Sequence, residues 1–196
     1  MRKVTKNDEE KVVDIITATF LENPGVNWLL RKGGSKEKKV RTLAAYAFIK
    51  AFLRDGVYLS SNEKGVALCY KYNLKIFSLK EFLYELKFAL FAIDLRRVRK
   101  VLQREAYRKS IRPLSGEYLY FWFFGVLPGG EGAAYELGRA IFKKAQVEKT
   151  PIYLETAMER NQRIYERFGF RTYHYWEDKK ENIQFWFMKW EVPCTS

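Results

Sequence analysis

The sequence has 196 residues, 47% of them hydrophobic and 17% aromatic, which excludes a disordered chain and predicts one domain spanning residues 1–196. Its 36 Lys and Arg against 23 Asp and Glu give a net charge of +13, which favours phosphates, nucleic acid or anionic lipid as partners. Two cysteines and one histidine provide neither a disulfide framework nor a zinc site, so we expect no metal. Because no apolar run could span a membrane and no secretory signal is recognisable, we expect a cytoplasmic protein without a membrane partner.

Hydrophobic periodicity predicts a short strand, a helix that begins with a capping box of Asn7 and Glu10, a second helix over residues 37–54, and then a hairpin. Residues 78–112 are predicted to form two helices broken near Asp94, in which Phe82, Leu86, Phe88, Leu90 and Phe91 occupy apolar, core-like positions. Strands then alternate with helices: the strands cover residues 117–126, 152–156, 171–176 and 183–190, and the helices cover 131–147 and 160–167. This order predicts an α/β fold with a mixed sheet between helices.

A glycine-rich segment connects the most apolar predicted strand to the helix after it. In VLPGGEGAAYELGRAI (residues 126–141), three glycines at 129, 130 and 132 precede the helix. Backbone amides of Gly132, Ala133 and Ala134 would then point out of a helix N-terminus, where they attract anions. A diphosphate cradle and a loose, glycine-assisted turn both fit this segment. It lacks the Gly-Lys-Ser/Thr of a P-loop.

A second candidate segment is YLETAMERNQRIYERFGF (residues 153–170). It places Tyr165 on a short helix beside a strand end, and Asn161 lies one helical turn earlier on the same face. A phenol in that position can donate a proton to a leaving group, although a tyrosine on a short helix is also a common core residue.

Together, FFGVLPGGEGAAYELGRAI (residues 123–141) and PIYLETAMERNQRIYERFGF (residues 151–170) resemble the coenzyme-binding half of the GCN5-related N-acetyltransferase (GNAT) superfamily. The front half resembles one subgroup of these enzymes in its Phe20, Pro24 and Trp28 pattern, its GVAL at residues 65–68, and the helical pair. The resemblance implies a GNAT-type acyl-CoA N-acyltransferase fold with a mixed, mostly antiparallel sheet flanked by helices, and the helical pair inserted before the central strand. It also implies that acetyl-CoA is the cosubstrate and that an acetyl group passes directly to a primary amine.

The resemblance assigns roles to particular residues. Tyr165 would protonate the leaving thiolate, and Glu155 or Glu117 would accept the amine proton through water. The coenzyme-binding residues would be Phe124 and Val126 by their backbone, Glu131, Gly132, Ala133 and Ala134 at the pyrophosphate, and Asn161. Three positions depart from the family pattern: Glu131 replaces Gln or Arg, Ala134 replaces Gly, and Met158 replaces a coenzyme-contacting Asn whose task Asn161 would share.

The acceptor is predicted to be a small-molecule or peptide amine, and the protein a monomer or homodimer. The alternative is a GNAT-fold module with weakened or lost catalysis that binds a partner or nucleic acid, which the basic charge leaves open. The predicted second helix of the pair carries eight basic residues: Arg96, Arg97, Arg99, Lys100, Arg104, Arg108, Lys109 and Arg112. They form either a solvated helix face or a surface that binds nucleic acid, an anionic acceptor or the coenzyme 3′-phosphate. Aromatic candidates for the acceptor pocket or the core are Trp28, Tyr46, Tyr120 and Trp122.

Overall fold

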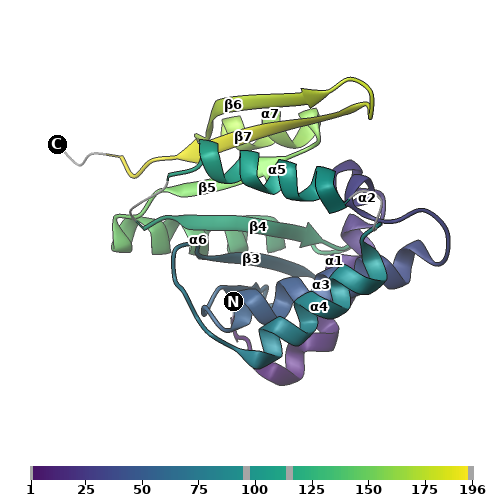
Figure 1. The fold of residues 1–196 in the computed structure, drawn as a ribbon. Coiled ribbons are helices and arrows are strands. Elements are labelled where there is room, and N and C mark those ends of the chain that lie inside the picture. The colour runs from purple at the N-terminus through teal and green to yellow at the C-terminus, as the bar shows by residue number, and fades with distance from the viewer. Residues whose placement is uncertain (1, 95–97, 114–116, 194–196) are drawn as a thin grey trace.

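In residues 2–94, 98–113 and 117–193, which are the part of the chain that the computed structural model describes, seven strands form one sheet between helices (Figure 1). The strand order is β1-β2-β3-β4-β5-β7-β6, and each neighbouring pair is antiparallel except β4 and β5, which are parallel. This confirms the predicted mixed, mostly antiparallel sheet. The strands are β1 (Arg2–Lys3), β2 (Val57–Leu59), β3 (Gly65–Lys71), β4 (Leu119–Val126), β5 (Ile152–Thr156), β6 (Arg171–Asp178) and β7 (Ile183–Trp190).

Helices cover both faces of the sheet (Figure 1). On one face, α1, α3 and α4 pack over β2, β3 and β4, and α2 and α5 continue this layer over β7 and β6. On the opposite face, α6 and α7 pack against the other side of β4, β5 and β7. The helices are α1 (Glu9–Phe20), α2 (Pro24–Leu29), α3 (Lys36–Phe52), α4 (Leu79–Ala92), α5 (Val98–Ile111), α6 (Ala133–Glu148) and α7 (Glu159–Arg167).

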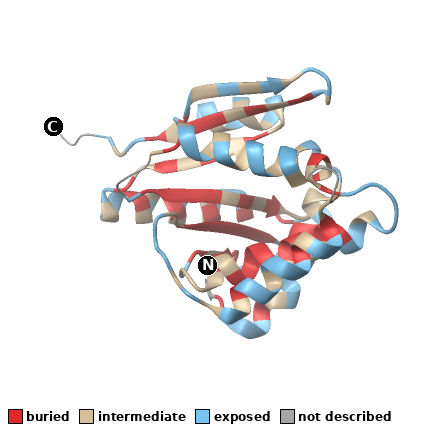
Figure 2. Ribbon diagram, viewed as in Figure 1, coloured by how far each residue is buried: buried red, intermediate tan, exposed pale blue. Residues whose placement is uncertain are grey.

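The core follows the central strands, whose residues are buried on both sides (Figure 2). Side chains of β4 alternate between the two layers: Tyr120 joins the layer of α1 and α3, whereas Phe121 joins the layer of α6. The continuous apolar sequence of β4 therefore reflects burial on both faces, as predicted. Cys69 on β3 is fully buried, which confirms its predicted place in a strand.

The start of the chain differs from the prediction. The capping box lies at Thr5 and Asp8, not at Asn7 and Glu10: an Asp8 carboxylate oxygen accepts from the Thr5 amide at 2.7 Å. A single 3₁₀ turn therefore precedes α1. The Asn-Pro-Gly at residues 23–25 begins α2, because the Asn23 side chain caps the Val26 amide at 3.1 Å.

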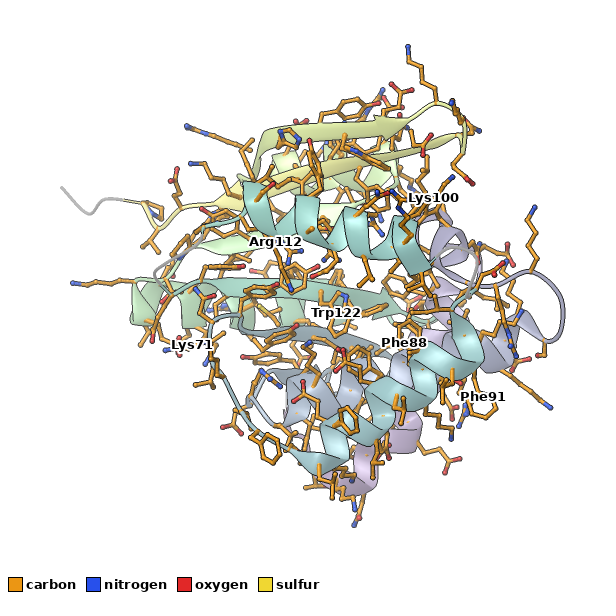
Figure 3. The ribbon with its side chains drawn as sticks, viewed as in Figure 1. Lys71, Phe88, Phe91, Lys100, Arg112 and Trp122 are labelled. Atoms are coloured by element: carbon orange, nitrogen blue, oxygen red, sulfur yellow. The ribbon has the colours of Figure 1, made fainter. Side chains whose placement is uncertain are left out.

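The helical pair is present, but α4 packs differently from the prediction. Phe88 is buried, whereas Phe82, Leu90 and Phe91 are each more than half exposed and Leu86 is 42% exposed. Figure 3 shows Phe91 pointing away from the sheet and Phe88 pointing toward it. The apolar repeat of α4 thus marks an outward face, because the narrow inward face needs only Phe88 and Ala92 to meet α3 and the sheet. Among the described residues, no helix combines the length and hydrophobicity that a transmembrane span requires.

Three residues about which the sequence made predictions, Arg96, Arg97 and Cys194, lie outside the described residues.

Candidate active site

The central feature of the site is the place where β4 and β5 part. The parallel pairing joins Leu119–Phe121 to Ile152–Leu154 and stops there, although β4 continues to Val126. At this point Leu68 of β3 pairs with Phe123 of β4, and the next residue, Cys69, pairs with Phe121. Trp122 has no partner on β3 and is therefore the extra residue of a β-bulge. A bulge bends its strand, which accounts for the divergence of β4 from β5.

Beyond the bulge, one backbone edge of β4 lacks a strand partner. The Leu127 amide donates to the Lys64 carbonyl at 2.8 Å, which fixes the hydrogen-bonding phase between β3 and β4. Since bonded and non-bonded pairs alternate in an antiparallel ladder, the N–H and C=O groups of Phe124 and Val126 point the other way, toward β5. Because β5 has already diverged, that edge is open to an extended ligand.

The loop after β4 carries the glycines. Gly129 and Gly132 have φ angles of +72° and +79°, which glycine adopts without strain. Gly132 is the N-cap of α6. The Ala133 amide donates to the Gly130 carbonyl at 3.1 Å, so it closes the turn, whereas the Gly132 and Ala134 amides have no backbone acceptor within the described residues. The Glu131 side chain is exposed, and its carbonyl accepts from Asn62 at 3.5 Å.

A lysine that the sequence analysis did not single out lies beside this loop. The Lys64 amine stands 2.9 Å from where a Cβ would be on Gly129. Lys64 belongs to the turn between β2 and β3, so its proximity arises only through the pairing of β3 with β4. A cation, two free amides and the positive end of the α6 dipole thus converge on one loop.

A cavity of about 1270 Å³ lies in the opening between β4 and β5 and extends under α4 and α5. Its walls include four of the predicted site residues: Phe124, Glu155, Asn161 and Tyr165. Val126 and the loop residues Glu131, Gly132, Ala133 and Ala134 are not among the cavity walls; they stand at the end of β4 and the start of α6.

Tyr165 stands on α7 at the side of the cavity nearest to Phe121. The two ring centres are 6.4 Å apart, and Phe170 lies 5.6 Å from Tyr165 on the other side. Burial raises the pKa of the Tyr165 phenol to about 12. The hydroxyl is therefore protonated at neutral pH and able to donate a proton into the cavity.

Glu155 at the end of β5 is enclosed by arginines. It accepts from Arg108 at 2.9 Å and from Arg112, and the Arg104 guanidinium lies 3.9 Å away. The Glu155 side chain is only 8% exposed. Its carboxylate is thus already engaged by three cations, two of which donate hydrogen bonds to it.

These arginines form one face of α5, because residues at spacings of four share a helix face. We call Arg104 and Arg108 of α5, together with Arg112 directly after its last residue, the α5 arginine face; it points inward, and Figure 3 shows Arg112 directed toward the sheet. The prediction of a solvated face is therefore wrong for these three residues, whose side chains are 3–16% exposed, whereas the predicted surface for an anionic partner stays a prediction. Arg99, Lys100 and Lys109 are exposed on α5.

The positive charge of this face acts on Tyr120 of β4. The Tyr120 hydroxyl accepts from Arg108 at 2.9 Å, and the Arg112 guanidinium carbon lies 4.2 Å from the ring centre. Burial alone would raise the pKa of Tyr120, but the charges of Arg112 and Arg108 outweigh it, so the pKa lies below its usual value. This wall of the cavity is therefore electropositive.

The remaining predicted residues divide between cavity and core. Tyr46, Tyr120 and Trp122 line the cavity, whereas Trp28 is buried beneath Arg104 and is not among the cavity walls.

Glu117 lies at the cavity edge, where its exposed carboxylate pairs with Lys71 at 3.0 Å. The ring of the single histidine, His174, contacts the Tyr107 hydroxyl at 2.5 Å. Among the described residues, no His, Cys, Asp and Glu side chains group closely enough to hold a metal ion.

Comparison with known proteins identifies the fold. No model of a protein family matches the sequence, and no curated protein matches it. Solved structures match over nearly the whole chain. A histone acetyltransferase HPA2 and related acetyltransferase from Corynebacterium glutamicum is 18% identical, with a TM-score of 0.69 over 100% of this chain and 96% of that one. Arylalkylamine N-acetyltransferase 2 from Aedes aegypti is 15% identical, with a TM-score of 0.65 over 98% of each chain.

A Desulfovibrio desulfuricans protein assigned to the GNAT family is 12% identical, with a TM-score of 0.55 over 98% of each chain. The chain therefore has the fold of the GNAT acetyltransferases, as the sequence resemblance implied. At these identities the likeness establishes the fold alone.

Proposed function

We propose that the protein is a GNAT-type N-acetyltransferase that transfers an acetyl group from acetyl-CoA to a primary amine. The observation that carries this proposal is the cavity between β4 and β5, which brings the open backbone edge of β4 at Phe124 together with the protonated phenol of Tyr165. The fold supports it, since the solved structures most similar to the chain include acetyltransferases.

The residues present fit acetyl-CoA. The open β4 edge at Phe124 and Val126 would pair with the two amide groups of the pantetheine arm. The Gly132 and Ala134 amides and the Lys64 amine would hold the pyrophosphate, and Gly132, whose positive φ favours glycine, presents no side chain to it. The Ala133 amide is already used within the turn, so we assign Ala133 a supporting role there. Asn161, one turn before Tyr165 in the cavity wall, would contact the pantetheine.

When bound, acetyl-CoA supplies an acyl group activated as a thioester. The chain's own task is to orient it, stabilise the charge that develops on its carbonyl oxygen, and move protons. A β4 backbone amide near Phe124, left without a partner by the bulge, would donate to that oxygen. Tyr165 would give its proton to the departing sulfur. Because the pKa of its phenol is about 12, the phenol carries that proton at neutral pH.

The amine must lose a proton before or during attack. Glu155 and Glu117 both line the cavity and remain the proposed acceptors, through water. The three arginines around Glu155 already engage its carboxylate in hydrogen bonds and ion pairs. Glu117 is bound by Lys71 alone among the described residues and is more exposed, which suits a proton passed to solvent.

The experiment is amine-dependent release of coenzyme A from acetyl-CoA, measured with a panel of small amines and peptides for the native protein and for Tyr165→Phe. We expect the variant to lose about 10²-fold or more of the turnover, because the phenol proton is removed. The matched control is Tyr135→Phe, on the exposed side of α6, which should leave turnover unchanged. A loss below about threefold in Tyr165→Phe would exclude the general-acid role.

A further inference from the structure

The α5 arginine face has more positive charge than its ion pairs require. Among the described residues, Arg104, Arg108 and Arg112 meet one buried carboxylate, Glu155, and the partly exposed Glu105, which pairs with Arg108 at 2.7 Å. Around the whole cavity, eight Lys and Arg side chains stand against four Glu side chains. A buried cation without a counter-charge is costly, so this wall favours the entry of an anion.

Two of the arginines also keep unused hydrogen-bond donors. Arg112 Nη1 and Arg104 Nε are buried, and neither has a hydrogen-bond partner among the described residues. Burial, together with the charge of Arg108, lowers the pKa of Arg104 to about 9. A guanidinium fork offers paired N–H donors that match the two oxygens of a carboxylate or phosphate.

Aromatic rings hold these guanidinium groups in place. The Arg104 carbon lies 3.9 Å from the Phe185 ring centre, and the Arg112 carbon lies 4.2 Å from that of Tyr120. Stacked guanidinium groups lose little further conformational freedom when a ligand binds. The arrangement is therefore preorganised to bind an oxyanion.

We propose that the α5 arginine face binds an oxyanion, a carboxylate or phosphate, that belongs to the amine acceptor. This inference rests on the proposed transferase function. The face lies with Tyr120 and Trp122 on one side of the sheet, whereas α6 and its glycine loop pack on the other side. The coenzyme pyrophosphate and the acceptor anion would thus approach the β4–β5 opening from opposite faces.

One cavity extends from the α5 arginine face to the residues proposed for acetyl transfer. Its walls run from Arg104, Arg108 and Arg112 past Trp122 to Phe124 and Tyr165. An acceptor held by its oxyanion at α5 can therefore direct its amine toward the opening where the acetyl group would lie. Fixing one end of the acceptor raises the effective concentration of the other end at the reacting centre.

The test is calorimetric binding of inorganic phosphate, with coenzyme A already bound so that the α6 loop is filled. Arg104→Gln should weaken phosphate binding about 10-fold or more, because one charge-assisted contact is lost. Arg104→Lys, which keeps the charge, should recover part of that loss. The matched control is Arg99→Gln on the exposed side of α5, which should not change phosphate affinity. Thermal unfolding of each variant checks that the fold is retained.

A second arm separates the two sources of the anion. If the arginines held the coenzyme 3′-phosphate, Arg104→Gln would weaken coenzyme A but not 3′-dephospho-coenzyme A. We expect the variant to bind both coenzymes as the native protein does, and O-phosphoethanolamine to bind more tightly than ethanolamine only when Arg104 is present. Loss of coenzyme A affinity alone in Arg104→Gln would overturn the assignment to the acceptor.

Failure of this inference is distinguishable from failure of the proposed function. Equal phosphate affinity in Arg104→Gln and Arg99→Gln, or no phosphate binding by the native protein, would overturn the oxyanion site even if acetyl transfer were found. If the protein does not bind coenzyme A, the proposed function fails, and the contrast between Arg104 and Arg99 variants, measured without coenzyme, still decides whether the anion site exists.

Discussion

The guanidinium carbon of Arg112 lies 4.2 Å from the ring centre of Tyr120, so the cation that directly follows α5 stacks on the strand that forms the open edge of the site. The same guanidinium donates to Glu155 on β5. One side chain thus connects α5, β4 and β5 at the point where the two strands begin to diverge. The site and the stability of this part of the fold are therefore coupled.

Glu155→Gln should destabilise the protein strongly. The carboxylate is the buried counter-charge of three arginines, and its loss leaves their charges uncompensated. We expect a cost of about 3 kcal/mol or more, with Tm lower by roughly 6–12 °C. The measurement is thermal unfolding. Glu117→Gln is the control, since its pair with Lys71 is exposed and should contribute little. If Glu155→Gln unfolded like the native protein but lost activity, its role would be that of a base and not that of a counter-charge.

Gly132→Ala and Gly138→Ala should change stability in opposite directions. Gly132 has a φ of +79° and open space around a new Cβ, so alanine there is strained without a clash and should cost about 1–2 kcal/mol. Gly138 lies inside α6, also with open space, where alanine should add about 0.5–1 kcal/mol. Urea unfolding measures both. Gly132→Ala should also weaken acetyl-CoA binding while Gly138→Ala leaves it intact; equal affinity in the two variants would exclude the loop as the pyrophosphate site.

Stability should fall at alkaline pH. Burial raises the pKa of Tyr58, Tyr118 and Tyr165 above the ordinary value of 10.0. The folded state therefore holds its phenol protons where the unfolded chain releases them. The stabilisation is complete below about pH 10 and declines as pH rises further, by up to about 1.4 kcal/mol per pH unit for each tyrosine.

The measurement is the free energy of unfolding in urea at several pH values between about pH 8 and pH 11. Tyr58→Phe, which removes one buried phenol, should make the decline shallower, whereas Tyr135→Phe on the exposed side of α6 should not. A free energy of unfolding that stays level across that range would show that these phenols exchange protons as readily in the folded state as in the unfolded chain.

Local sequence signals predicted most of the fold. The apolar run of β4 predicted a strand buried on both faces, and the glycines predicted the start of α6 within two residues. Spacing also placed Asn161 and Tyr165 together, and both line the cavity. These signals are local because strand burial, turn chemistry and helix faces each depend on a few neighbouring residues.

Spacing could not say which face of α4 or α5 points inward. Phe82 and Phe91 have the chemistry of core residues but are exposed, while Arg104 and Arg112 have the chemistry of surface residues but are buried or nearly so. Which helix face points inward depends on the side chains that the helix packs against. The inward arginines of the α5 arginine face contact Glu155 and aromatic rings, which bind guanidinium groups. That Arg104, Arg108 and Arg112 recur every four residues was the available signal. The bulge at Trp122 and the approach of Lys64 to Gly129 depend on pairing with β3, which one strand's sequence does not specify.

The most direct test of the central claim is thermal unfolding with and without acetyl-CoA, using a short RNA as the comparator. Acetyl-CoA at about 100 times its dissociation constant should add roughly 2.7 kcal/mol and raise Tm by about 5–10 °C. Gly132→Ala should reduce this shift, and the RNA should give none. No shift with acetyl-CoA, together with a shift from RNA that salt abolishes, would contradict the transferase and support a nucleic-acid-binding module on the same fold.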